Sequence, residues 1–186
     1  MKGRLFVISA PSGTGKTTII KNLMKTLPEA VLSVSVTTRR PRPGETDGVD
    51  YHFISEAEFQ KMLKDGRLLE HAKVHNSYYG TPRTPIEKWL NDDKIILLDI
   101  DVQGAHNVKK VFQDAVLIFL LPPSREELIR RLKSRGTNAG ADLDLRIKDA
   151  EVELSEKDFY DYHVVNDNMD KAVQEIVGII NKTCSV

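Results

Sequence analysis

The sequence predicts an α/β protein with three layers, in which a parallel sheet of five strands lies between helices. Two observations lead to this prediction. Short apolar runs alternate along the chain with segments of helical periodicity, the pattern of parallel strands joined by crossover helices. The alternation breaks once, at residues 37–84, where a loop, short strands and one helix replace it. We therefore expect a core made of residues 1–36 and 85–186, with residues 37–84 inserted as a subdomain.

The core begins with a strand, a glycine turn, a helix and a second strand. Leu5 to Ile8 is a short run of β-forming apolar residues that leads directly into the turn. From Lys16 to Leu27 apolar residues recur at helical spacing, and Pro28 marks the end of this helix. The apolar segment Val31 to Val36 predicts the second strand.

The inserted segment is organised differently. Thr37 to Asp50 contains three arginines, two prolines and two glycines, which is typical of a loop. Ser55 and Glu58 have the spacing of a capping box, which predicts a helix that ends at Gly66. The strands expected here are Tyr51–Ile54, Leu68–Val74 and Ser77–Thr81.

The remaining core strands and helices follow the insertion. The strands expected are Ile95–Ile100, Ala115–Leu121 and His163–Val165. Ser124 and Glu127 form a second capping box, which opens a helix that reaches Arg135. Gly136 to Ala141 contains two glycines and no large apolar residue, so we expect a mobile connection. The last expected helices span about 142–155 and 169–183.

Composition excludes several kinds of protein. Basic and acidic residues balance at 27 each, whereas proteins that coat nucleic acid carry a net basic surface. Cys184 is the single cysteine, so internal disulfides and cysteine-based zinc sites are excluded. The most apolar stretch, Ala115–Leu121, is far shorter than the roughly 20 residues that span a membrane. We expect a cytoplasmic protein that binds neither nucleic acid nor membranes.

A phosphate-binding motif lies between the first strand and the first helix. Its residues are Ala10, Pro11, Ser12, Gly13, Thr14, Gly15, Lys16 and Thr17. They match G-x-x-x-x-G-K-[ST] except at the first position, where Ala10 replaces glycine, and this requires a negative φ at Ala10. Gly13 and Gly15 allow successive N–H groups to point at one anion. Lys16 supplies positive charge for the β and γ phosphates, and the Thr17 hydroxyl can reach Mg²⁺. The motif therefore predicts nucleotide binding.

An arginine-rich loop is the second candidate for binding phosphate. Arg39 and Arg42 lie in a segment whose prolines restrict it, and guanidinium groups match phosphate oxygens in pairs. Tyr51 and Tyr79 offer hydroxyl donors nearby. Taken alone, the segment slightly favours the alternative of a solvated basic loop.

The segment Thr37–Ile54 resembles the characteristic motif of guanylate kinases: a threonine pair, an arginine, a second basic residue, an acidic residue, a glycine and Tyr-x-Phe. The resemblance continues over essentially the whole chain. Its further segments are Tyr78–Thr81, Asp99–Gly104, Pro122–Ser124, Arg131–Gly136 and Val165–Asp167. It implies reversible transfer of the γ-phosphoryl group of ATP to GMP, giving ADP and GDP, with Mg²⁺ as cofactor and dGMP as a further acceptor. It also implies a GMP-binding insertion, a helical lid at about 131–147, and a monomer or weak homodimer.

The resemblance also implies which residues bind GMP. Those that would hold its phosphate are Arg39, Arg42, Tyr51 and Tyr79. Those that would face its base are Ser35, Glu70, Thr81 and Asp101. Guanine presents N1–H and its amino group on one edge, and the Glu70 carboxylate can accept from both, whereas adenine presents an acceptor at N1. The alternative for Glu70 is an exposed carboxylate at a strand edge.

Further residues are implied for ATP, catalysis and the metal. Those that would bind ATP, besides the phosphate motif, are Arg131, Arg135, Asn166 and Asp167. Those that would be catalytic are Lys16, Arg42, Arg135 and Arg146. Thr17 would bind Mg²⁺, and Asp99 would orient it through water, although a helix-capping role fits Asp99 equally well. For the helical arginines, the alternative is an ordinary charged surface.

Two other functions are compatible with parts of this pattern. A guanylate-kinase-like scaffold module would bind protein ligands without catalysis, but such modules typically lack the intact phosphate motif found here at Lys16 and Thr17. A kinase for another phosphorylated acceptor would share the motif but has no need of Glu70. A GTPase is disfavoured because the sequence has no N-K-x-D motif.

Overall fold

The computed structural model of the protein describes residues 3–74, 76–134 and 141–185. It confirms a central sheet of five parallel strands in the order β2-β7-β1-β8-β9. The strands are β1 (Arg4–Ser9), β2 (Ala30–Ser33), β7 (Ile95–Asp99), β8 (Val116–Leu121) and β9 (Tyr162–Val165). Because all five run in the same direction, their carboxyl ends meet at one edge of the sheet.

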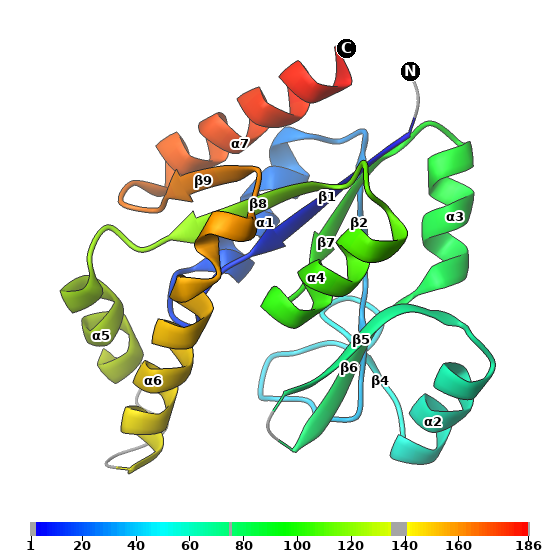
Figure 1. Ribbon diagram of the computed structural model, residues 1–186, viewed down its shortest axis with the longest axis horizontal. Coiled ribbons are helices and arrows are strands. Elements are labelled where there is room, and N and C mark those ends of the chain that lie inside the picture. The colour runs from blue at the N-terminus through cyan, green and yellow to red at the C-terminus, as the bar shows by residue number, and fades with distance from the viewer. Residues whose placement is uncertain (1–2, 75, 135–140, 186) are drawn as a thin grey trace.

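Helices cover both faces of this sheet, as expected for three layers (Figure 1). One face carries α1 (Lys16–Thr26) and α7 (Met169–Cys184), and the other carries α3 (Arg83–Asn91) and α4 (Val102–Val111). Along β1, Phe6 and Ile8 pack with α1 and α7, whereas Leu5 and Val7 pack with α3 and α4. Burial on both faces explains why the strand is a continuous apolar run.

A second sheet has the order β4-β3-β6-β5, and it lies below the central sheet in Figure 1. Its elements are β3 (Val36–Thr37), β4 (His52–Phe53), β5 (Leu68–Val74), β6 (Ser77–Pro82) and the adjacent α2 (Glu56–Lys64). Phe59, Met62, Val36 and Leu68 form a small separate apolar cluster between this helix and the sheet. This part of the chain therefore packs around side chains of its own.

The prediction of one strand over Val31–Val36 was wrong. The segment is divided between β2, in the central sheet, and β3, which pairs with β6 in the second sheet. The chain leaves one sheet at Val34 and Ser35 and enters the other immediately. An apolar run of this length predicts extended structure but carries no information about which strand it pairs with.

Two helices, α3 and α4, were not predicted. At the start of α3, Pro82 makes no capping hydrogen bond through its side chain, so the usual sequence signal is missing. At α4 the cap is Asp101, whose carboxylate accepts from the N–H of Gly104 at 2.8 Å. Asp101, assigned above to the guanine site, is therefore also a helix cap.

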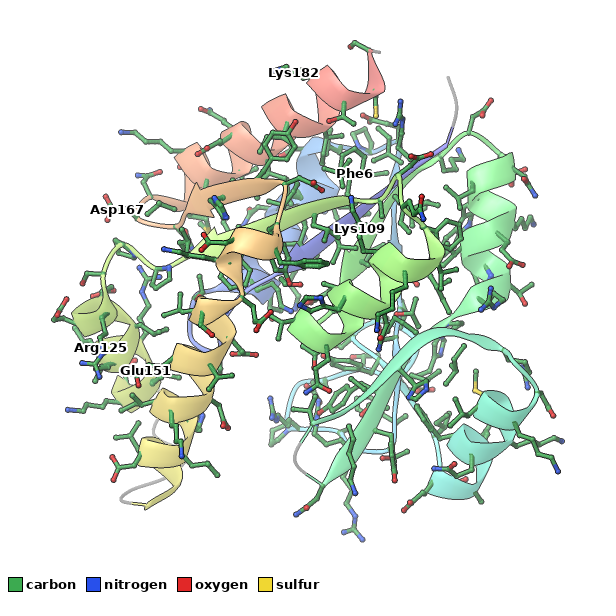
Figure 2. The ribbon with its side chains drawn as sticks, viewed as in Figure 1. Phe6, Lys109, Arg125, Glu151, Asp167 and Lys182 are labelled. Carbon is green, nitrogen blue, oxygen red and sulfur yellow. The ribbon has the colours of Figure 1, made fainter. Side chains whose placement is uncertain are left out.

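A helical pair projects from the core beside the second sheet (Figure 1). It consists of α5 (Arg125–Ser134) and α6 (Ala141–Ser155), followed by the short 3₁₀ helix η1 (Lys157–Phe159). Leu128, Leu132 and Ala150 pack between the two helices, and Arg125 forms an ion pair with Glu151 (Figure 2). The connection that we expected to be mobile, Gly136 to Ala141, lies outside the described residues except for Ala141.

Among the residues that the structure describes, no helix is long and apolar enough to cross a membrane.

The cap of α2 offers a test of how this part of the chain is stabilised. The Ser55 hydroxyl accepts a hydrogen bond from the N–H of Glu58 at 3.1 Å. Replacing Ser55 with alanine should lower the free energy of unfolding by about 1 kcal/mol because this N–H loses its partner. Ser55→Asp keeps a capping oxygen and should remain near the wild-type value. Urea denaturation of the three proteins measures both effects, and an equal loss in both variants would contradict the capping role.

Candidate functional site

A cleft of about 280 Å³ lies at the carboxyl ends of β1 and β7, facing the second sheet. It brings together residues far apart in the sequence. Those of its wall that the sequence predicted are Ala10, Pro11, Ser12, Gly13, Gly15, Lys16, Thr17, Ser35, Arg42, Tyr51, Glu70, Tyr79, Asp99 and Asp101. The wall also contains Ala72, Val74, Gly80, Ile100 and Glu153, which the sequence did not single out. A binding site formed by the two sheets together is the simplest interpretation.

The phosphate motif forms a tight turn between β1 and α1. Gly13 and Gly15 have φ values of 93° and 97°, a region that other residues rarely adopt. Ala10 is not among the residues with positive φ, as its replacement of glycine requires. The N–H of Thr14 donates to the carbonyl of Pro11 at 3.1 Å, which closes the turn. Gly15, Lys16 and Thr17 line the cleft, so the N-terminus of α1, which favours anions, lies at its wall.

The Lys16 ammonium is held at the carboxyl end of β7. Its Nζ lies 2.7 Å from the Asp99 carboxylate and donates to the carbonyl of Ile100 at 2.9 Å. Burial lowers the pKa of Lys16, but the Asp99 charge and hydrogen bond raise it by more, so the net shift is upward. Lys16 therefore remains a cation at neutral pH. The helix cap at this position is Asp101 rather than Asp99, which removes the alternative considered for Asp99.

Glu70 on β5 is a buried carboxylate with one tightly held oxygen. Its residue is only 5% exposed, which excludes the exposed strand-edge alternative. The Thr81 hydroxyl on β6, itself fully buried, donates to Oε1 at 2.6 Å. Burial raises the pKa of Glu70 to about 7; the hydrogen bonds from Thr81 oppose this shift, and the charge of Asp101 adds to it. A ligand that donates hydrogen bonds to this carboxylate would stabilise its charged form.

The arginine loop is held by an acidic residue that the sequence reasoning did not assign. Glu45 accepts from the guanidinium of Arg39 at 2.8 and 3.0 Å and from the backbone N–H of Arg42 at 2.7 Å. Burial raises the pKa of Glu45, but these bonds lower it by more, so it stays ionised. Arg39 also donates to the Tyr79 hydroxyl at 3.2 Å. The Thr37–Ile54 motif did contain an acidic position, and its pairing with an arginine was the available signal.

The cleft wall contains Arg42, Tyr51 and Tyr79. Arg39 is also a described residue, but it is not part of this wall. The Arg39 guanidinium instead lies 5.5 Å from the centre of the Tyr51 ring. Arg39 therefore contacts two tyrosines of the wall and orients them, and the alternative of a freely solvated basic loop does not fit these contacts. Ser35 also belongs to the wall and is buried.

Two of the three helical arginines make specific contacts with the phosphate motif. The Arg131 guanidinium donates to the carbonyl of Thr14 at 3.3 Å and is oriented by Glu127 at 2.7 Å. Arg146 donates to the Ser12 hydroxyl at 3.2 Å. An ordinary charged helix surface does not account for these bonds. The third arginine, Arg135, lies outside the described residues.

Asn166 and Asp167 follow β9 and differ in their surroundings. The Asn166 amide is buried and donates to the carbonyl of Thr14 at 2.7 Å, so it stabilises the turn of the phosphate motif. Asp167 is exposed, and Figure 2 shows it at the outer edge of the molecule. The structure therefore brings Asn166, but not Asp167, into contact with the predicted site.

Glu153 on α6 is a member of the cleft wall that the sequence did not indicate. Its carboxylate accepts from the backbone N–H of Ser12 at 3.2 Å. Burial raises its pKa, and the hydrogen bond from Ser12 opposes this shift. It is one of many charged residues on α6, so nothing in the sequence distinguishes it.

Thr17 and Asp99 are the candidates for holding a metal ion in this cleft. A hydroxyl and a carboxylate are oxygen ligands, which Mg²⁺ prefers. The part of the chain that the structure describes has no group of three or more His, Cys, Asp or Glu side chains that could hold a metal. Such a site would therefore depend on ligands from the substrate.

Comparison with known proteins gives one consistent result. The family model described as guanylate kinase matches residues 2–183. The guanylate kinase of Leifsonia xyli subsp. xyli is 49% identical over 95% of this chain and 70% of its own length, and that of Thermotoga maritima is 49% identical over 97% and 87%. The crystal structure of guanylate kinase from Anaplasma phagocytophilum superposes with a TM-score of 0.83 at 35% identity, covering 97% of this chain and 86% of that one.

The raised pKa of Glu70 predicts a specific dependence of stability on pH. The folded protein binds a proton at Glu70 up to about pH 7, whereas the unfolded chain releases it near its ordinary value of 4.5. The free energy of unfolding should therefore fall as pH rises between these values, by about 3 kcal/mol at 1.4 kcal/mol per pKa unit. Glu70→Gln should lack this component. Urea denaturation at pH 5 and pH 8, without nucleotides, gives the comparison, and an identical pH dependence in both proteins would contradict it.

Proposed function

The chain belongs to the guanylate kinase family, whose activity is the transfer of a phosphoryl group from ATP to GMP, and we propose that the cleft between its two sheets is where both nucleotides bind. The observation that carries this proposal is a buried carboxylate, Glu70, in the same cleft as an intact phosphate motif. One end of the cleft has the chemistry to recognise a base, and the other has the chemistry to bind a chain of phosphates.

We infer that Glu70 recognises the guanine base. Its carboxylate accepts two hydrogen bonds from one edge of guanine, where adenine presents an acceptor that would leave the buried carboxylate unpaired. Thr81 holds Oε1 at 2.6 Å, so the orientation of the carboxylate exists before the base enters. Asp101 and Ser35, also in the wall, are available for the rest of the base.

We infer that Arg39, Arg42, Tyr51 and Tyr79 hold the phosphate of GMP. Its second pKa is near 6, so at neutral pH it is largely a dianion and needs no general base to attack ATP. Catalysis then depends on alignment and on positive charge that allows two anions to approach. Glu45 and the Tyr79 hydroxyl engage the Arg39 guanidinium beside the tyrosines, so Arg39 would exchange bonds to Glu45 for bonds to the phosphate as GMP binds.

ATP would bind at the phosphate motif. The N–H groups at the start of α1 and the Lys16 ammonium would hold its β and γ phosphates. Arg131 and Asn166 both bond to the carbonyl of Thr14, and they thereby support the turn itself. Arg146 on α6 reaches Ser12 of the motif, which is close enough for it to contribute charge to the transferred group, and we propose the same role for Arg135.

Mg²⁺ fits the oxygen ligands of Thr17 and Asp99, with the remaining ligands supplied by phosphates and water. When bound, the ion neutralises charge that develops on the phosphates. The Thr17 hydroxyl would bind it directly, and Asp99 would orient its water ligands. Asp99 also fixes Lys16, so it positions one cation whether or not a second is present.

A panel of acceptors tests the proposed reaction. ADP formation from ATP and Mg²⁺ should require GMP, with little turnover of AMP, CMP or UMP. Lys16→Ala should lower kcat at least about 100-fold because a charge that stabilises the transition state is lost. Lys25→Ala removes an exposed lysine of the same helix and should leave activity unchanged. Turnover of another nucleotide in preference to GMP would refute the assignment of the base site.

Glu70→Gln tests the base site itself. The KM for GMP should rise about 10- to 100-fold because hydrogen bonds to a charged acceptor contribute about 1.5–3 kcal/mol. The KM for ATP should stay within about twofold, since ATP contacts the other end of the cleft. Glu175→Gln, an exposed change on α7, provides the matched control. An unchanged KM for GMP would remove Glu70 from the site.

A further inference from the structure

Gly104 is a glycine whose backbone does not require one. It lies in the first turn of α4, where its φ is not positive, so an alanine could adopt the same conformation. A glycine inside a helix is also less favourable than an alanine. Its N–H already donates to the Asp101 carboxylate at 2.8 Å and is not free to bind a ligand. What distinguishes Gly104 is therefore the space that a missing side chain leaves.

The Glu70 carboxylate occupies the edge of that space. A Cβ built on Gly104 would lie 2.8 Å from Oε2 of Glu70, closer than atoms of this kind approach one another, and 3.2 Å from two side-chain atoms of Ile100. The Glu70 carboxylate is buried and its other oxygen is held by Thr81 at 2.6 Å, so Oε2 can give way only by turning out of its present orientation toward the cleft.

The helix, in contrast, is held firmly against β5. One turn beyond Gly104, the Asn107 amide donates to the carbonyl of His71, the residue after Glu70 on β5, at 3.2 Å. Ala105 and Val108 of α4 are fully buried in the same cluster as Leu69 of β5. A side chain at position 104 would therefore displace the carboxylate rather than the helix.

We propose that Gly104 is a positioning residue for guanine selectivity: the space it leaves lets the Glu70 carboxylate lie against the first turn of α4, with Oε2 in the position from which it accepts a hydrogen bond from the base. The proposal rests on the base-recognition role of Glu70 inferred above. Any side chain at position 104 pushes this oxygen out of line with the donors of guanine. Gly104 contributes no hydrogen bond and touches no reacting atom.

The test is a double-substitution cycle with Gly104→Ala and Glu70→Asp. Gly104→Ala should raise the KM for GMP about tenfold, the loss of one charged hydrogen bond, while the KM for ATP and kcat at saturating GMP stay within about twofold. Its preference for GMP over IMP, which lacks the amino group, should fall by a similar factor. Glu70→Asp shortens the side chain by one methylene and so moves the carboxylate away from position 104. The KM for GMP of the double variant should therefore be no higher than that of Glu70→Asp alone.

Gly178→Ala is the matched control, because Gly178 is also helical but an added Cβ would meet nothing within 4 Å. It should leave every constant unchanged. If Gly104→Ala proves too unstable to assay, solubility recovered in the double variant supports the proposal, and equal instability in both refutes it. Recovery is expected only if the clash with Glu70 is the cause.

The outcomes separate this proposal from the role of Glu70. A normal KM for GMP in Gly104→Ala, beside a raised KM in Glu70→Gln, would overturn the role of Gly104 and leave Glu70 in the site. If the rises in the KM for GMP caused by the two single substitutions add in the double variant, the effect of Gly104→Ala comes from its contact with Ile100. That result would also overturn the proposal. A normal KM in Glu70→Gln would refute both.

Discussion

Ile8 of β1 pairs with Asp99 of β7 because the two strands run parallel, and both therefore end at the same edge of the sheet. The phosphate motif follows one strand, and the Asp99–Asp101 segment follows the other. Lys16 bridges them at 2.7 Å. Every other feature of the site is arranged around this junction: the second sheet faces it with Glu70, and α6 approaches it with Arg146 and Glu153. Parallel pairing thus converts two distant sequence segments into one binding surface.

A chain with no net charge can nevertheless offer a local site for anionic ligands, because specific acidic partners hold some of its cations in fixed positions. Lys16 is held by Asp99, Arg39 by Glu45 and Arg131 by Glu127. Each partner fixes the direction of a cation. The local field at the cleft is therefore set by geometry, and it does not need an excess of basic residues over the whole surface.

Local signals predicted much of the fold. The strand at Leu5–Ile8, the phosphate turn and the cap at Ser55 depend on neighbouring residues, and they were found. Pairing depends on distant residues, which is why Val31–Val36 was taken as one strand. The motif resemblance singled out Glu70 as a candidate, but its burial and its proximity to Gly104 arise only when β5 meets α4. Glu153 could not be found, because only the packing of α6 distinguishes it from other charged residues of that helix.

The two elements that flank the cleft each have an apolar cluster separate from the central core. Leu128, Leu132 and Ala150 hold α5 to α6, whereas Phe59 and its neighbours hold α2 to the second sheet. Each flank nevertheless remains tied to the core, the second sheet through Leu69 and the helical pair through Leu154, so cooperativity is only partly divided. A substitution within either small cluster should therefore loosen its own flank more than the central sheet.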